Sequence, residues 1–188
     1  TRGHAPTSGL AVSNHLSNLD IVVFSSARPS IFVSKKEVRD WPVFGWLAAL
    51  GGTIFVDREN PQHVHQTIHL LATTLESDIP VLLYAEGTSS GGETVLPFRS
   101  SLLQAAVDSK AICLPAAIDY QLPMGEGSVP DEICYWRDMV FGPHLLNLLG
   151  KSEIQATASF GEASGIEGRS RKELARELHQ GVVALRDL

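Results

Sequence analysis

The segment Asn14–Asp20 contains the residue types and the spacing that a general base requires. Its histidine, His15, stands five positions before Asp20 and follows the apolar run Leu10–Val12. An imidazole can take up a proton near neutral pH, and a nearby carboxylate can fix its tautomer and stabilise its cationic form. We therefore expect a His15–Asp20 pair that activates a substrate hydroxyl directly, without a covalent enzyme intermediate.

The same residues also fit a purely structural interpretation. Ser17–Asp20 matches S-x-x-[DE], a capping box in which the acidic side chain reaches back to the N-cap of a helix. Asp20 would then stabilise the start of a helix, and His15 would bond to a loop carbonyl. The heptapeptide alone leaves both interpretations open.

Further polar residues follow predicted strands. Arg58 comes just after the strand-like segment Thr53–Val56, and the turn Glu86–Thr88 comes just after Val81–Tyr84. In open α/β sheets, ligand sites gather at the carboxyl ends of the strands. We therefore expect these residues to lie on the same edge of a sheet as His15.

Taken together, the blocks resemble the glycerolipid acyltransferase superfamily, which includes the lysophosphatidic-acid acyltransferases. The matches follow the family order over about residues 9 to 120: N-H-x4-D at Asn14, His15 and Asp20, a glycine-to-arginine block ending at Arg58, E-G-T-x-S at Glu86, Gly87, Thr88 and Ser90, and an apolar block with Pro115. The chain departs from the family pattern where the family has proline, arginine and glycine, at Ala85, Ser89 and Ser101.

The resemblance implies transfer of a fatty acyl group from acyl-CoA or acyl-carrier protein to a lysolipid hydroxyl. The expected acceptor is 1-acyl-sn-glycerol-3-phosphate, giving phosphatidic acid. Lyso-ornithine lipid is the alternative, because the arginine lost at Ser89 would serve a phosphate. The resemblance implies His15 as the general base, Asp20 as its orienting partner, and no cofactor or metal. It implies an acceptor site formed by Arg58, Glu86, Gly87 and Thr88, with Arg99 as the nearest replacement for the lost cation.

Functions of other kinds stay open on the sequence. An inactive lipid-binding domain could keep the fold without the reaction, although the intact His15–Asp20 pair speaks against it. A thioester hydrolase would use His15 to activate water. Three histidines lie close together in the sequence: His63, His65 and His69. We interpret them as a solvated helix face and not as a metal site, since no nearby carboxylate or cysteine completes a set of ligands. A basic-aromatic patch could contact anionic lipid headgroups, although a plain solvated surface is the slightly favoured interpretation. It comprises Lys35, Lys36, Arg39 and Trp41.

The elements that must position these residues alternate between strand and helix. The predicted strands, short and mostly apolar, are Gly9–Ser13, Ile31–Ser34, Thr53–Val56, Val81–Tyr84, Ile112–Asp119 and Ile154–Phe160. The predicted helices are Asn18–Ser26, Val43–Leu50, Pro61–Ser77, Ser100–Asp108, Pro143–Leu149 and Ser170–Leu188, with Gln121–Val129 as a surface loop. Apolar strands between helices predict a layered α/β domain whose central, mostly parallel or mixed sheet is flanked by helices.

Composition narrows the classes of function. The 188 residues suit one domain over residues 1–188, which the resemblance identifies as an acyltransferase domain, and the net charge of −6 argues against a nucleic-acid partner. Two cysteines are too few for a disulfide framework, which favours a reducing compartment. No stretch of 18 apolar residues occurs. We expect a membrane-associated protein on the cytoplasmic face of the inner membrane, with an N-terminal anchoring part that precedes this chain.

Overall fold

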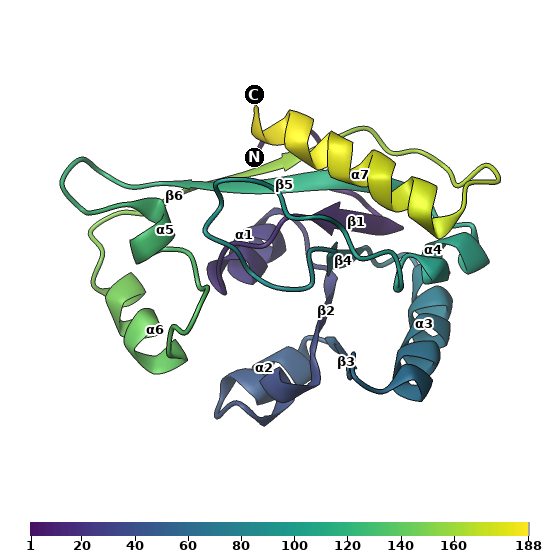
Figure 1. Ribbon diagram of the computed structural model, residues 1–188, viewed down its shortest axis with the longest axis horizontal. Helices are drawn as coiled ribbons and strands as arrows, with labels where there is room; N and C mark the ends of the chain where they lie inside the picture. Colours follow the sequence, from purple (N-terminus) through teal and green to yellow (C-terminus); the bar gives the residue numbers. More distant parts are fainter. Residues whose placement is uncertain (188) are drawn as a thin grey trace.

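A six-stranded sheet in the order β3-β2-β4-β1-β5-β6 runs through the computed structural model, which describes residues 1–187 (Figure 1). Its neighbouring strands are parallel except for the last pair, in which β6 runs antiparallel to β5. The strands are β1 Leu10–Ser13, β2 Ile31–Lys35, β3 Ile54–Val56, β4 Val81–Tyr84, β5 Cys113–Gln121 and β6 Gln155–Phe160. The predicted α/β fold with a mostly parallel sheet is therefore confirmed.

The helices cover the two faces of the sheet. They are α1 Leu19–Ala27, α2 Phe44–Leu50, α3 Pro61–Leu75, α4 Gln104–Ser109, α5 Val129–Glu132, α6 Phe141–Leu149 and α7 Arg171–Arg186, with a 3₁₀ helix η1 at Lys36–Asp40. Two helix starts follow directly from the sequence. Asn60 caps α3 ahead of Pro61, and Ser170 forms a reciprocal capping box with Glu173 at α7.

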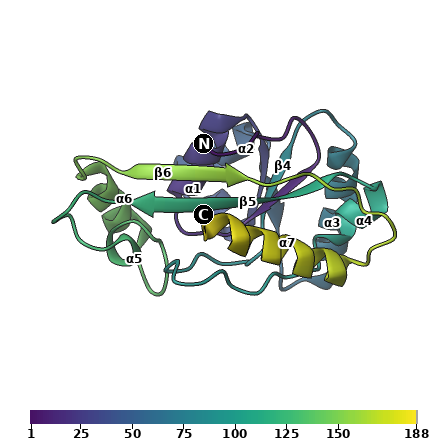
Figure 2. The ribbon, with the colours of Figure 1, turned by 90° about the horizontal axis from the view of Figure 1, so that it is seen from above.

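Each face of the sheet has its own apolar core. In β1, Leu10 and Val12 point to the face covered by α3, α4 and α7, and Ala11 points to the face covered by α1 and α6. This alternation is the two-residue period of a strand that is buried on both sides. Figures 1 and 2 show α7 lying along β5. Strand β1 lies between β4 and β5, so the residues that follow it start from the middle of the sheet.

Several predicted boundaries differ from the structure. The helix predicted at Ser100–Asp108 begins only at Gln104, because the residues before it form a turn. The predicted loop Gln121–Val129 starts inside β5 and ends inside α5, and η1 was not predicted. The two helices that were not predicted, η1 and α5, are too short to produce a helical period in the sequence. The last predicted helix ends at Arg186, and Leu188 lies outside the described residues.

The parallel strands bring the candidate residues to one edge. His15, Lys35, Arg58 and Glu86 stand at or just beyond the carboxyl ends of β1, β2, β3 and β4. The strand-end rule thus places side chains from distant parts of the sequence around one position. Over residues 1–187, none of the helices combines the length and the apolar character needed to cross a bilayer.

Candidate active site

His15 and Asp20 form a hydrogen-bonded pair at the end of β1. The Nδ1 atom of His15 lies 2.7 Å from Oδ2 of Asp20, and the Asp20 side chain is fully buried while His15 is 21% exposed. A carboxylate oxygen is an acceptor, so the hydrogen of this bond belongs to Nδ1. The other nitrogen, Nε2, is then the basic one and is available to a substrate.

The Asp20 carboxylate accepts hydrogen bonds from several other donors besides His15. Its Oδ2 accepts a 2.8 Å bond from the Leu16 amide, and its carboxylate also accepts from the Ser17 amide at 3.2 Å. Its Oδ1 accepts a 2.7 Å bond from the hydroxyl of Tyr120 in β5. Burial and the charge of Asp20 raise the pKa of Tyr120, which keeps this hydroxyl protonated as a donor.

Asp20 makes contacts that each of the two interpretations of Asn14–Asp20 expects. Asp20 does reach back to the Ser17 amide, as a capping residue would. The reciprocal half of the capping box is absent, because the Ser17 hydroxyl accepts from Leu19 and the Asp20 amide bonds to the Ser17 carbonyl. One carboxylate thus orders the start of α1 and orients His15.

Two contacts fix His15 beyond its aspartate. The imidazole stacks on the ring of Tyr84 in β4, with centroids 4.1 Å apart and planes 16° from parallel. The preceding side chain, Asn14, bridges to β5 by accepting from the Ile118 amide at 2.9 Å and donating to its carbonyl at 3.0 Å. Sequence reasoning did not find the roles of Tyr84 and Tyr120. Tyr84 directly precedes the Glu86 turn, but no local signal connects Tyr120 with a residue 100 positions away.

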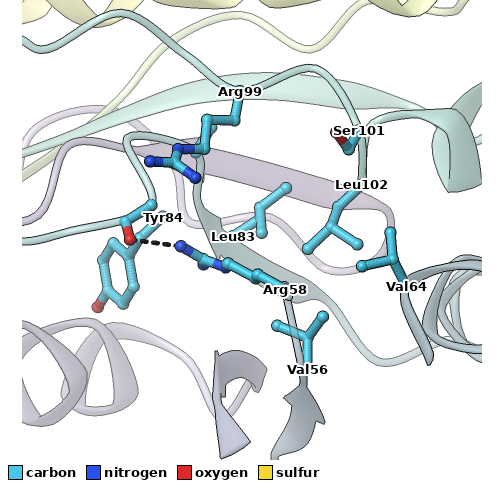
Figure 3. Close-up of a pocket in the computed structure, with 10 residues that line it drawn as sticks. Val56, Arg58, Val64, Leu83, Tyr84, Arg99, Ser101 and Leu102 are labelled. Atoms are coloured by element: carbon cyan, nitrogen blue, oxygen red, sulfur yellow. Dashed lines mark hydrogen bonds between the residues drawn. The ribbon is translucent and has the colours of Figure 1, made fainter. Parts of the chain in front are cut away.

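The second group of site residues is a pair of arginines. Arg58 donates from Nη1 to the Gly87 carbonyl. The side chains of Arg58 and Arg99 lie near each other (Figure 3), and both approach Gly87. A Cβ atom at Gly87 would lie 2.7 Å from Nη1 of Arg58 and 2.9 Å from Nε of Arg99, and Gly87 has φ +77°. The positive φ therefore favours glycine at this position. Burial and the neighbouring charge of Arg99 lower the pKa of Arg58.

Two adjoining cavities connect these groups. One of about 100 Å³ is lined by both arginines, Tyr84 and Gly87 (Figure 3). The other, of about 180 Å³, includes His15 and Lys35. Arg58, Tyr84 and Gly87 line both cavities, so the base and the cations lie around two adjoining cavities. Sequence reasoning had assigned Lys35 to a surface patch; its place at the end of β2, like that of Arg58 after β3, is the signal that could have found it.

Glu86 and Thr88 sit differently from each other. Thr88 is exposed and lines the cavity that holds His15. Glu86 is 3% exposed, and its Oε1 accepts from the Leu96 amide at 3.3 Å while Oε2 has no partner among the described residues. Burial raises the pKa of Glu86 to about 7. Glu86 thus helps to fix the loop after β4 through its hydrogen bond to the Leu96 amide.

The remaining candidates have structural contacts of their own. His63 accepts a 3.1 Å bond from the Asp57 amide and so orders the turn that carries Arg58. Lys36 pairs with Asp57 at 2.6 Å. Within residues 1–187, no group of three or more His, Cys, Asp or Glu side chains is placed to hold a metal.

Ser89 needs a separate explanation because Gly87–Gly91 formally matches the nucleophile pattern G-x-S-x-G. That pattern places its serine in a sharp turn between a strand and a helix. Here β4 leads into a long loop, and the Ser89 hydroxyl donates to the Tyr135 carbonyl. The hydroxyl is thus engaged in holding the loop, and the expectation of direct substrate activation by His15 keeps its geometric basis.

Comparison with known proteins gives a consistent result. The model of the family described as Acyltransferase matches residues 3–119. The chain is 38% identical to a lyso-ornithine lipid O-acyltransferase of Brucella abortus, covering 94% of this chain and 70% of the relative. It is 37% identical to the enzyme of the same name from Rhodobacter capsulatus, covering 75% and 51%. It is 32% identical to a 1-acyl-sn-glycerol-3-phosphate acyltransferase of Neisseria meningitidis, covering 70% and 54%.

A solved structure shares the fold. The 1-acyl-sn-glycerophosphate acyltransferase of Thermotoga maritima aligns with a TM-score of 0.63 at 18% identity, over 96% of this chain and 66% of that one. The matched portions of the three curated relatives above amount to between 51% and 70% of their lengths. The chain thus corresponds to a part of the length of these proteins.

Proposed function

Because the chain belongs to the Acyltransferase family, we propose that it transfers a fatty acyl group from a thioester donor to the hydroxyl of a lysolipid. The observation that carries this proposal is the His15–Asp20 pair, whose buried carboxylate leaves Nε2 of the imidazole facing a cavity lined by cations. A base beside a site for anions suits an acceptor that has both a hydroxyl and an anionic headgroup.

The reaction begins with removal of a proton by His15. Its Nε2 takes the hydroxyl proton of the acceptor while the oxygen forms a bond to the thioester carbonyl carbon. Asp20 stabilises the imidazolium through the 2.7 Å bond to Nδ1. General-base help of this kind is worth about 10²–10⁴ in rate.

The second step breaks the carbon–sulfur bond. The tetrahedral intermediate collapses to the ester, and the sulfur leaves with the bonding pair. The imidazolium of His15 returns its proton to the sulfur, so the products are an ester and a free thiol. The pair is then in its starting protonation state, ready for another acceptor.

The headgroup is held by the cations of the two adjoining cavities. Arg58 and Arg99 flank Gly87, and Lys35 lines the larger cavity beside His15. Arginine suits carboxylate or phosphate because its planar fork can donate two parallel bonds. Thr88 adds a hydroxyl at the same cavity. Glu86 contributes indirectly, by supporting the loop that carries Gly87 and Thr88.

Lyso-ornithine lipid is our first choice of acceptor. The support is the 38% identity to the Brucella abortus relative over 94% of this chain. A headgroup with one carboxylate can be bound by Arg58 alone. The second candidate is 1-acyl-sn-glycerol-3-phosphate, which the sequence motifs put first. A specific observation favours it, since Arg99 next to Arg58 supplies the second cation that a phosphate prefers.

Competition between the two lysolipids at equal concentration tests the choice. We expect preferential acylation of lyso-ornithine lipid by the purified protein, with acyl-CoA and acyl-carrier protein tried in parallel as donors. A clear preference for the phosphate lipid would replace the first candidate by the second. Both donors are cytoplasmic molecules, so the proposed reaction belongs to the cytoplasmic face of a membrane.

Thioester turnover with and without lysolipid separates the other classes. A transferase releases thiol only when an acceptor is present, whereas a hydrolase releases it in either case. An inactive lipid-binding domain would release none. We expect acceptor-dependent release, and release independent of the acceptor would contradict the proposal.

A further inference from the structure

Helix α2 presents a face of large apolar side chains to solvent. Four of them are more than half exposed: Val43 at 65%, Trp46 at 78%, Leu47 at 57% and Leu50 at 85%. The opposite side of the helix is fixed by Gly45, where a Cβ atom would lie 2.0 Å from the Arg39 carbonyl oxygen. The close approach of α2 to η1 thus sets the rotation of the helix and turns its apolar side chains outward.

This α2 face adjoins the cavity that holds His15. Val38, Trp41 and Ala48 line that cavity from η1, the turn after it and α2, while Ile21 lines it from α1. Ile21 itself is 38% exposed. The opening of the candidate active site is therefore bordered by the elements that carry the exposed apolar residues.

The size of the cavity bears on where a lipid chain lies. Its volume of about 180 Å³ is smaller than the roughly 300–1,000 Å³ of typical small-molecule sites. It can hold the headgroup and the reacting hydroxyl of a lysolipid, but not a long acyl chain. The acyl chain needs an apolar environment outside the cavity. The α2 face lies next to the cavity at Trp41, which lines both the cavity and the hollow formed with Val43, Trp46, Leu47 and Leu50.

We propose that the α2 face, formed by Val43, Trp46, Leu47 and Leu50, docks on a lipid bilayer and delivers the lysolipid directly to His15. This inference rests on the proposed function, because a lysolipid acceptor resides in a bilayer. The apolar residues enter the boundary between headgroups and acyl chains, as the apolar face of an interfacial helix does. Tryptophan suits this region because its ring is amphipathic.

Charge contributes little to this docking. Arg39 lines an open hollow with the apolar residues of α2, and Asp40 lines the same hollow. Lys36 is already paired with Asp57 at 2.6 Å, and Glu37 is exposed on the same 3₁₀ helix. Positive and negative groups thus nearly balance around the face. Vesicle binding should depend mainly on buried apolar area and only weakly on salt.

Vesicle sedimentation with two triple variants tests the surface. One variant carries Trp46→Ser, Leu47→Ser and Leu50→Ser. The control carries three apolar residues outside η1 and α2 that are about half exposed: Leu70→Ser, Ile79→Ser and Ile112→Ser, at 54%, 48% and 51%. With vesicles of phosphatidylcholine and phosphatidylglycerol, we expect the α2 variant to lose about tenfold or more in partition coefficient and the control to change less than about twofold. Equal partitioning of the two variants would overturn the proposal.

Fluorescence provides a second readout that does not depend on the triple variant folding. Brominated lipids quench tryptophans that enter the bilayer, so vesicles should quench part of the wild-type emission. Trp46→Ser should lose the quenched part. Quenching that is unchanged in Trp46→Ser would contradict insertion at α2.

Activity separates failure of this docking from failure of the proposed function. With a lysolipid embedded in vesicles, the α2 variant should have a lower kcat/KM than wild type. With a short-chain lysolipid dissolved as monomers, the two should be equal. Absence of acyl transfer by wild type in both assays would refute the function, while sedimentation would still decide the docking. If the wild type sediments as a dimer, the α2 variant as a monomer, and vesicle binding is equal, the face joins two copies instead.

Discussion

His15 and Arg58 line the same cavity, but their surroundings differ in how charge is compensated. The carboxylate behind His15 accepts bonds from the imidazole, two backbone amides and the Tyr120 hydroxyl. Among the described residues, Arg58 makes one hydrogen bond, to a carbonyl, and its pKa is lowered by burial and by the charge of Arg99 more than it is raised by Glu37. Within the described chain, neither Arg58 nor Arg99 is paired with a carboxylate.

This difference indicates that the charges of the His15–Asp20 pair are compensated within the protein, whereas those of Arg58 and Arg99 would be compensated by an anionic ligand. The histidine–aspartate pair is preorganised, so it can act on a proton without rearrangement, which is where electrostatic catalysis gains most. The two arginines repel each other, and an anion placed between them would relieve that repulsion. We therefore expect variants of the first region to reduce kcat and variants of the second region to raise the KM of the acceptor.

Replacing the base should have the largest effect. His15→Ala should lower kcat by about 10² or more, because proton transfer to a positioned base is lost. The substitution leaves Asp20 with its backbone donors and Tyr120, so the protein should remain folded by circular dichroism. His65→Ala, an exposed histidine on α3, is the control and should keep wild-type turnover. Near-normal turnover in a folded His15→Ala protein would eliminate the proposed base.

Altering its partner should come next. Asp20→Asn should lower kcat by about tenfold or more, since a neutral amide stabilises the imidazolium poorly. Its NH₂ group would also face donors that now bond to a carboxylate, so stability should fall by about 1 kcal/mol or more. Tyr120→Phe removes only one of those donors and should cost less activity. Urea unfolding together with kcat measures both effects; a larger kcat loss in Tyr120→Phe than in Asp20→Asn would reverse the assigned roles.

The cation pair should give an intermediate effect on KM. Arg58→Ala should raise the acceptor KM roughly tenfold, the loss of one charge-assisted contact, with a smaller change in kcat. Arg99→Ala should match it for 1-acyl-sn-glycerol-3-phosphate and change little for lyso-ornithine lipid. Arg28→Ala, an exposed arginine just after α1, serves as the control. A pure kcat loss in Arg58→Ala would place that residue with the dyad instead.

The aromatic support of His15 should matter less. Tyr84→Leu removes the ring stacked at 4.1 Å and should lower kcat a few-fold by loosening the imidazole. Tyr84→Phe keeps the ring and removes a buried hydroxyl that lacks a partner among residues 1–187, so its activity should be close to wild type. The pH–rate profile of each variant, compared with that of wild type, tests whether Tyr84 positions His15. Only Tyr84→Leu should change the profile.

The last prediction concerns stability rather than rate. Because the native pKa of Glu86 is raised to about 7 from 4.5, the native state keeps a proton that the unfolded chain has lost between these values. The free energy of unfolding should therefore fall as pH rises through this range. Glu86→Gln should remove this slope and gain about 3 kcal/mol above pH 7. Urea unfolding at both ends of the range checks it, with the exposed Glu93→Gln as control; an unchanged slope in Glu86→Gln would contradict the assignment.

Much of the framework could be predicted from local sequence. The apolar strands and the capped starts of α3 and α7 were found because their patterns lie within a few residues. The spacing of His15 and Asp20 was informative for the same reason, since a strand-end turn followed by a helical turn brings them together without help from distant segments. The tendency of ligand sites to gather at the carboxyl ends of parallel strands then predicted Arg58 on the same edge.

Other features depended on tertiary structure. Tyr120 reaches Asp20 only because β5 pairs with β1, and Arg99 meets Arg58 only because both approach Gly87. The direction of Glu86 and the outward face of α2 likewise follow from packing against neighbouring segments. Local patterns specify which elements form, because propensity and capping act within a few residues. Which side chains meet is decided by the order of strands in the sheet, and that order is a property of the whole chain.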